Sequence, residues 1–241
     1  MRKFLVFDLG ETLIDFNMTG VWREQMRLDV IPKMFTNLKS FHSTITNFPQ
    51  YSTFLDTAYA SIARGGYPVS MINRIKNALT TLKIPFSQKI INSLLQPFDQ
   101  VFATKAKIYP QVKSTLEELK NLGYILGLWS NTPWQSPGYM SERVMNRFNI
   151  REYFSAVHFS GDYEIRKPNA KALEIVQKSS QFKKDDMIYI GNAEVDIQTG
   201  SNFGIPTVWI KRNGDILSEK CPRPTYELNS ISELGSILPI Q

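Results

Sequence analysis

Short, strongly apolar segments recur along the chain and are separated by turn residues. They are apolar at successive positions, which is typical of strands in a parallel sheet that is covered by helices on both faces. The sequence therefore predicts a buried parallel sheet. Its expected strands are residues 3–7, 124–129, 156–159, 187–190 and 207–210.

Helical patterns lie between these segments. Apolar positions in residues 112–122 repeat with a spacing near 3.6 and are followed by Gly123, a residue that commonly ends helices. A second pattern covers residues 170–176, and Pro168 before it is expected at the first helical position. Strand then helix, repeated several times, predicts a doubly wound, Rossmann-like α/β fold.

Residues 16–105 interrupt this alternation. This interval has no strand pattern, but amphipathic helical segments occur near residues 22–30, 55–62, 72–82 and 90–95, with proline and glycine between them. We therefore expect an all-helical module inserted after the first strand. The predicted organisation is an α/β core of residues 1–15 and 107–241 and a helical cap domain of residues 16–106.

The composition fits an ordinary globule. With 241 residues and 42% hydrophobic residues, the chain can bury a core, as one domain or one domain with an insertion. The first apolar stretch is too short and too charged for a secretory signal, and no apolar run approaches the roughly 18 residues that a membrane span needs. We expect a cytoplasmic protein with no membrane partner.

Charge and cysteine content narrow the classes of ligand. The formal charge is +6 with a pI near 9.3, which favours anionic ligands. The basic residues are scattered, so no nucleic-acid partner is expected. Cys221 is the only cysteine, which excludes an intrachain disulfide. His42 and His158 lie far apart in the sequence, and neither belongs to a zinc-binding motif, so no zinc site is expected.

Polar residues with chemical potential follow the expected strands. Asp8 follows the first, Ser130-Asn131 the second, and Arg166-Lys167-Pro168 lies after the third. Gly191-Asn192 and Asp196 follow the fourth. In an open parallel sheet the carboxyl ends of the strands form the ligand crevice. The sequence therefore predicts that a carboxylate, a hydroxyl-amide pair, a lysine and a second acidic loop meet at one edge.

These segments resemble the four motifs of the haloacid dehalogenase (HAD) superfamily of aspartate-nucleophile hydrolases. The first motif is similar to residues 7–13, Phe-Asp-Leu-Gly-Glu-Thr-Leu, and the second to Ser130-Asn131-Thr132. Lys167-Pro168 is similar to the third, and Gly191-Asn192 through Asp196 to the fourth. The resemblance covers nearly the whole chain and implies a HAD core with a helical C1-type cap.

The resemblance also implies a catalytic scheme. Asp8 would attack phosphorus and form an aspartyl-phosphate, which divides hydrolysis into two easier displacements. Mg²⁺ would be held by the Asp8 carboxylate, the Gly10 carbonyl and the loop of Asn192 and Asp196.

The remaining roles go to donors that face the phosphoryl group. Lys167 would neutralise charge at the nucleophile and at the phosphoryl oxygens. The Ser130 hydroxyl and the Asn131 backbone N–H would donate hydrogen bonds to those oxygens as charge develops.

The most informative departure from the family pattern lies in the first motif. HAD phosphatases commonly carry a second Asp two residues after the nucleophile, which protonates the leaving oxygen and later activates water. Gly10 stands there in this sequence, and Glu11 points elsewhere because it is the adjacent residue.

The glycine leaves three readings. The favoured one is an Mg²⁺-dependent phosphatase that acts on a small phosphate monoester, because Asn192 and Asp196 look like a metal site. The second is a haloacid dehalogenase-like hydrolase of carbon–halogen bonds, since a halide needs no protonation. The third is a weakly active or inactive HAD-fold protein that binds a phosphorylated ligand or a partner protein.

The cap is expected to select the substrate, a small phosphorylated metabolite, by closing over the crevice. The loop of residues 133–139, rich in aromatic residues and proline, is a second candidate wall of the pocket, or else a surface bend. The sequence leaves open whether the protein is a monomer or a homodimer. Candidate specificity residues on the cap are Trp22, Arg23, Arg64, Tyr67 and Arg74.

Overall fold

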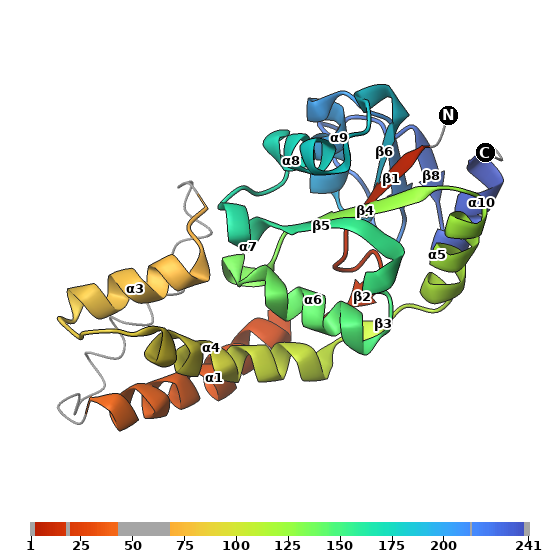
Figure 1. Ribbon diagram of the computed structural model, residues 1–241. Helices are drawn as coiled ribbons and strands as arrows, with labels where there is room; N and C mark the ends of the chain where they lie inside the picture. The colour runs from red at the N-terminus through yellow and green to blue at the C-terminus, as the bar shows by residue number, and fades with distance from the viewer. Residues whose placement is uncertain (1–2, 18–19, 43–67, 213, 239–241) are drawn as a thin grey trace.

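The computed structural model describes residues 3–17, 20–42, 68–212 and 214–238, with the backbone alone for residues 20–27. These residues form a six-stranded sheet in which every neighbouring pair is parallel, in the order β5-β4-β1-β6-β7-β8 (Figure 1). All five predicted strands are confirmed, and β8 was not predicted. The strands are β1 Phe4–Phe7, β4 Ile125–Ser130, β5 Phe154–Phe159, β6 Met187–Gly191, β7 Thr207–Ile210 and β8 Tyr226–Leu228.

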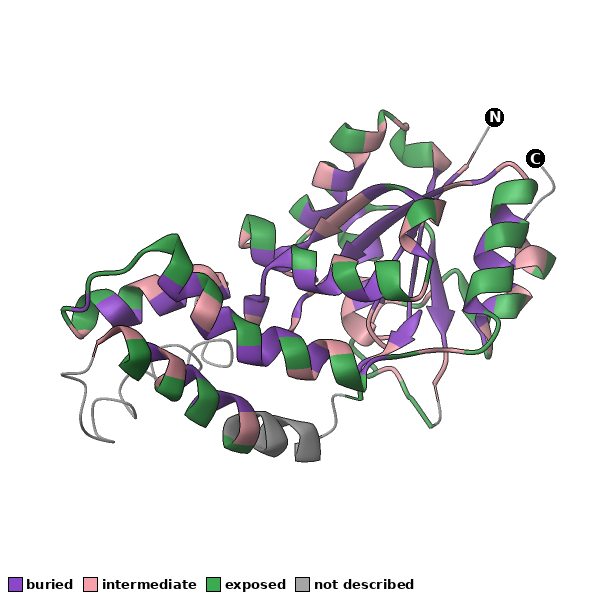
Figure 2. Cartoon of the chain, turned by 60° about the horizontal axis from the view of Figure 1, so that its bottom comes forward, coloured by how far each residue is buried: buried purple, intermediate pink, exposed green. Residues whose placement is uncertain are grey.

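Two apolar clusters cover the two faces of this sheet. On one face, Leu5 and Phe7 of β1 pack in a cluster with residues of α5 Val112–Asn121, α6 Gly138–Arg147 and α10 Leu234–Ile237. On the other face, Phe4 and Val6 pack in a cluster with α8 Lys171–Ser180 and α9 Glu194–Phe203. Helices on both faces confirm the doubly wound α/β fold, and Figure 2 shows the sheet as the buried layer.

Strand β1 lies at the centre of the sheet and fixes the position of the residue that follows it. All four of its residues are fully buried, and they pair with β4 on one side and β6 on the other. The backbone N–H of Asp8 continues the ladder by donating to the Ile190 carbonyl at 2.8 Å. Asp8 is therefore anchored by the backbone at the carboxyl edge of the sheet.

The predicted helix boundaries are right at one place and wrong at another. Helix α5 ends before Gly123, whose φ of 88° gives the left-handed turn that glycine adopts readily. Pro168 is not the first helical residue, because α8 begins at Lys171. Asn169 makes the turn instead: its N–H donates to the Arg166 carbonyl at 3.0 Å, and its Oδ1 accepts from the Lys171 N–H at 3.0 Å.

A helical segment is inserted between two short strands. β2 Ile14–Asp15 pairs antiparallel with β3 Lys107–Ile108, and the chain between them contains helices α1 Gly20–Phe41, α3 Met71–Thr81 and α4 Gln88–Lys105. In Figure 1 these helices extend to one side of the sheet. The expected helix near residues 55–62, together with Arg64 and Tyr67, lies outside the described residues, as do the side chains of Trp22 and Arg23.

Short helical turns complete the fold. They are η1 Pro133–Gln135, η2 Arg151–Tyr153, α7 Ser160–Tyr163, η3 Lys184–Asp186 and η4 Ile231–Glu233.

Within the described residues, no helix is both long enough and apolar enough to span a membrane.

Candidate active site

Asp8 is buried at the end of β1, with 4% of its surface exposed. Its Oδ1 accepts hydrogen bonds from the Ser130 hydroxyl at 3.0 Å and from Lys167 Nζ at 2.5 Å. Its Oδ2 accepts from the Thr12 hydroxyl at 3.0 Å. Three donors from three different segments of the chain therefore fix the orientation of this carboxylate.

Lys167 lies between two carboxylates. Its Nζ is 2.5 Å from Oδ1 of Asp8 and 2.5 Å from Oδ1 of Asp196, and the side chains are almost fully buried. Burial lowers the pKa of Lys167, but the charges of Asp196 and Asp8 outweigh it and raise the pKa above its usual value. Burial, opposed by Lys167, raises the pKa of Asp196 to about 6. Two acids and one ammonium leave this cluster with an excess of negative charge.

Asp196 is held by the geometry of its own loop. It lies in the first turn of α9, where its Oδ2 accepts from the Ala193 N–H at 2.9 Å. Gly191 lets the side chain fold back, because a Cβ at residue 191 would be 2.3 Å from Cγ of Asp196. The glycine of this motif is therefore required by the close approach of the acid.

Asn192 and Asn131 tie the loops together. Asn192 Oδ1 lies 2.9 Å from the Thr12 hydroxyl, which links the loop of the fourth motif to the loop after Asp8. Asn131 Oδ1 accepts from the Lys167 N–H at 3.0 Å and so positions the lysine loop. The structure thus brings together the predicted residues Asp8, Ser130, Asn131, Lys167, Asn192 and Asp196.

Thr12 was missed by the sequence reasoning, although it lies within the first motif. Its hydroxyl has one proton but lies 3.0 Å from Asp8 Oδ2 and 2.9 Å from Asn192 Oδ1, so it can donate to only one of them at a time. Its position four residues after Asp8 was a usable signal, because the chain turns back there, with the Leu13 N–H donating to the Leu9 carbonyl at 2.9 Å.

These oxygen atoms fit a hard divalent cation. Asp8 Oδ2 and Asn192 Oδ1 both lie within hydrogen-bond distance of the Thr12 hydroxyl, which can donate to only one of them. The cluster around Lys167 carries more negative than positive charge, which favours the binding of a cation. Mg²⁺ prefers carboxylate, amide and carbonyl oxygens, and one or two carboxylates suffice when water and substrate complete its shell. Among the described residues there is no cluster of three or more His, Cys, Asp or Glu, so the protein would supply a sparse set of ligands.

Glu11 is engaged away from the cluster around Lys167. Its Oε2 accepts from the Tyr109 hydroxyl at 2.7 Å and its Oε1 from the Phe16 N–H at 3.3 Å, and burial raises the pKa of the carboxyl group. Arg212 stacks 3.8 Å from the Tyr109 ring centroid and donates to the Glu11 carbonyl at 2.8 Å. These contacts hold the loop after Asp8 against Tyr109 and Arg212.

Contacts join the helical insertion to the core. Glu164 Oε1 accepts from the Ser70 N–H and from Asn73 Nδ2, each at 2.8 Å, at the start of α3. Arg74, a predicted specificity residue, is buried and donates to the Trp134 carbonyl. The loop of residues 133–139 therefore lies against the insertion, and its Trp134 ring packs edge-on against Phe98.

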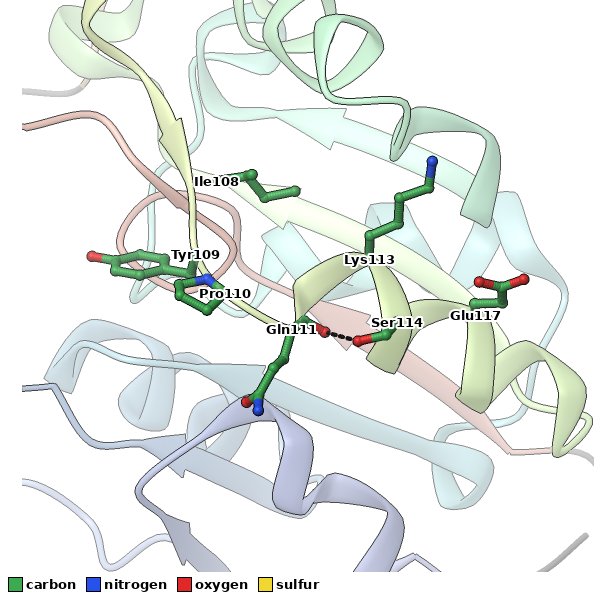
Figure 3. Close-up of a pocket in the computed structure, with 7 residues that line it drawn as sticks. All are labelled: Ile108, Tyr109, Pro110, Gln111, Lys113, Ser114 and Glu117. Atoms are coloured by element: carbon green, nitrogen blue, oxygen red, sulfur yellow. Dashed lines mark hydrogen bonds between the residues drawn. The ribbon is translucent and has the colours of Figure 1, made fainter.

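A separate groove opens where β3 meets α5, and Figure 3 shows its lining side chains. Its volume is about 540 Å³. It includes none of the predicted site residues, although Tyr109 on its wall also contacts Glu11. The groove is therefore distinct from the cluster around Asp8.

The fold and the cluster define the class of protein: an α/β enzyme with paired acids and a lysine at the carboxyl edge of a parallel sheet. Residues 53–210, more than half of the chain, match the model of the haloacid dehalogenase-like hydrolase family, and the chain belongs to this family. This match includes Ser130, Lys167 and Asp196 but begins after Asp8. The role of Asp8 therefore rests on the first motif and on the geometry.

Known proteins of two activities are similar to this chain. A phosphoglycolate phosphatase of Vibrio parahaemolyticus is 25% identical over 70% of this chain and 75% of its own length. An (S)-2-haloacid dehalogenase of Pseudomonas putida is 25% identical over 54% of this chain, and the match spans about half, 56%, of that enzyme. The solved structure of the HAD hydrolase YfnB of Bacillus subtilis superposes with a TM-score of 0.62 at 16% identity, covering 99% of each chain.

Proposed function

We propose that the protein is an Mg²⁺-dependent phosphatase that hydrolyses a small phosphate monoester through an aspartyl-phosphate on Asp8. The observation that carries this proposal is the buried Asp8 carboxylate, held by Ser130, Thr12 and Lys167 at the carboxyl edge of the sheet. A carboxylate fixed by several donors is ready to attack without losing further freedom.

In the first step, one carboxylate oxygen of Asp8 attacks phosphorus, and the bond from phosphorus to the leaving oxygen breaks. In the second step, water attacks the same phosphorus and Asp8 is released as a carboxylate. Ser130 and Lys167 would donate to the phosphoryl oxygens as their charge increases.

Electrostatics support the need for a metal ion. The cluster already carries an excess of negative charge, and a phosphate monoester would add more. Asp8, Asn192, Asp196 and the Gly10 carbonyl would hold Mg²⁺, which supplies charge neutralisation and polarises the phosphoryl group when bound. The structure of the fold relative YfnB is described as bound to magnesium.

Dehalogenation is the second candidate, because Gly10 provides no acid and a halide needs none. A direct test is a panel of small phosphate esters beside 2-haloacids, each assayed with Mg²⁺ and with a chelator. We expect phosphate release that stops on chelation and returns with Mg²⁺. Halide release that ignores the chelator would overturn the phosphatase proposal in favour of the dehalogenase. No product from either panel, with tight binding of a phosphorylated ligand, would overturn both.

A further inference from the structure

The position two residues after Asp8 carries no side chain, and nearby acids are already engaged. Among the described side chains of this region, Glu11 is bound by the Tyr109 hydroxyl and Asp15 accepts from the Asn17 N–H at 2.5 Å. Asp196 is bound by Lys167 and by the Ala193 N–H. Each of these carboxylates is already held by donors of the protein itself, and none of them stands at the position two residues after Asp8.

We propose that this protein selects phosphates whose leaving group departs without a proton, namely acyl, enol or aryl phosphates, over alkyl phosphates of the same size. This inference rests on the proposed function and names its substrate class. When Asp8 attacks, the electron pair of the breaking P–O bond stays on the leaving oxygen. A carboxylate, enolate or phenolate bears this charge far better than an alkoxide does.

The absence of a carboxylate at residue 10 also affects the second step. The water that attacks the aspartyl-phosphate must release a proton, and no carboxylate at residue 10 takes it, so the proton passes to solvent. A positioned acid or base contributes roughly 10²–10⁴ in rate. Breakdown of the aspartyl-phosphate is therefore slow, and good substrates produce a rapid burst of leaving group, followed by a slower steady rate that is common to all of them.

Residue 10 has room for the missing acid. The φ angle of Gly10 lies outside the left-handed region, so a residue other than glycine can adopt this backbone conformation. A Cβ built on Gly10 would meet Phe16 at 3.6 Å and 3.8 Å, which is ordinary van der Waals contact. The glycine is therefore not required by the backbone or by packing, and Gly10→Asp and Gly10→Asn are reasonable variants of the folded protein.

The test measures kcat/KM with Mg²⁺ for aryl phosphates of graded leaving-group pKa and for one acyl and one alkyl phosphate. We expect the wild type to lose rate steeply as the leaving-group pKa rises. Gly10→Asp should flatten this slope, raise kcat/KM for the alkyl phosphate by about 10²–10⁴, and remove the burst. Gly10→Asn matches Gly10→Asp in size without the acid, so, whatever its absolute rate, it should not flatten the slope.

The outcomes distinguish a failure of this inference from a failure of the proposed phosphatase function. A shallow slope in the wild type, with phosphate released from alkyl and aryl esters alike, would overturn the inference and leave the phosphatase standing. An equal flattening by Gly10→Asn would also overturn it, because the acid would not be the cause. Absence of phosphate release from every ester would instead refute the proposed function. The wild-type slope decides the matter even where Gly10→Asp fails to fold.

Discussion

Replacing Lys167 by methionine removes the positive charge that lies between Asp8 and Asp196. Methionine has a similar length and no hydrogen-bond donor, so Lys167→Met changes charge more than shape. The side chains of Lys167, Asp8 and Asp196 are 3%, 6% and 0% exposed, so water cannot replace the lost partner. The variant therefore leaves two buried carboxylates facing each other.

The expected cost follows from the burial of this cluster. Removing one partner of a buried ion pair costs roughly 3–5 kcal/mol, and Lys167 serves two acids at 2.5 Å. With an m-value of about 2 kcal/mol/M, the urea midpoint should fall by about 1.5–2.5 M. Mg²⁺ should restore part of this stability, because a bound cation replaces the missing charge.

Urea unfolding, followed by tryptophan fluorescence and circular dichroism, measures the change. Lys113→Met, at an exposed position of α5, is the matched control and should alter stability by no more than about 0.5 kcal/mol. Adding Asp196→Asn to Lys167→Met should recover stability, since the amide can still accept from the Ala193 N–H. A loss below about 1 kcal/mol in Lys167→Met, or no recovery in the double variant, would refute the reasoning.

Three further predictions concern single positions. Gly191→Ala should cost about 1–3 kcal/mol in urea unfolding, because its Cβ would lie 2.3 Å from Cγ of Asp196; an unchanged midpoint would contradict this packing. The backbone N–H at the start of α3 holds the pKa of Glu164 below 4.5, so the wild type should be more stable than Glu164→Gln above pH 4.5 and lose this advantage as the pH falls through the folded pKa. Thermal melts across pH 3–7 check it, and a constant difference would refute it. Asp8→Asn should fold normally and hydrolyse at background rate, so retained activity would place the chemistry elsewhere.

The fold was largely predictable because a strand that is buried on both faces is apolar at successive positions. Residues 4–7 and 187–190 read as continuous apolar segments for this reason. Strand β8 escaped prediction because two of its three residues, Tyr226 and Glu227, are exposed at the edge of the sheet. The strands β2 and β3 have two residues each, which is too short for any periodicity to show.

The candidate site was predictable as a set of loops but not as a network. Strand order places Asp8, Ser130 and Asn192 at one edge, and that inference needs only the parallel topology. The position of Lys167 between two acids depends on a turn held by the Asn131 side chain, a contact across 36 positions of the chain that local patterns cannot reveal. The misplaced helix start at Pro168 has a different, local origin, because Asn169 makes a turn before α8 by accepting from the Lys171 N–H.

The most direct test of the central claim is to trap the phosphorylated enzyme. The protein is mixed with Mg²⁺ and radiolabelled acetyl phosphate, an acyl phosphate, quenched in acid during turnover, digested and mapped by mass spectrometry. The account predicts one labelled peptide that carries the phosphoryl group on Asp8, absent from Asp8→Asn and from chelator-treated enzyme. Phosphate release without any labelled Asp8 peptide, or label on another residue, would contradict it.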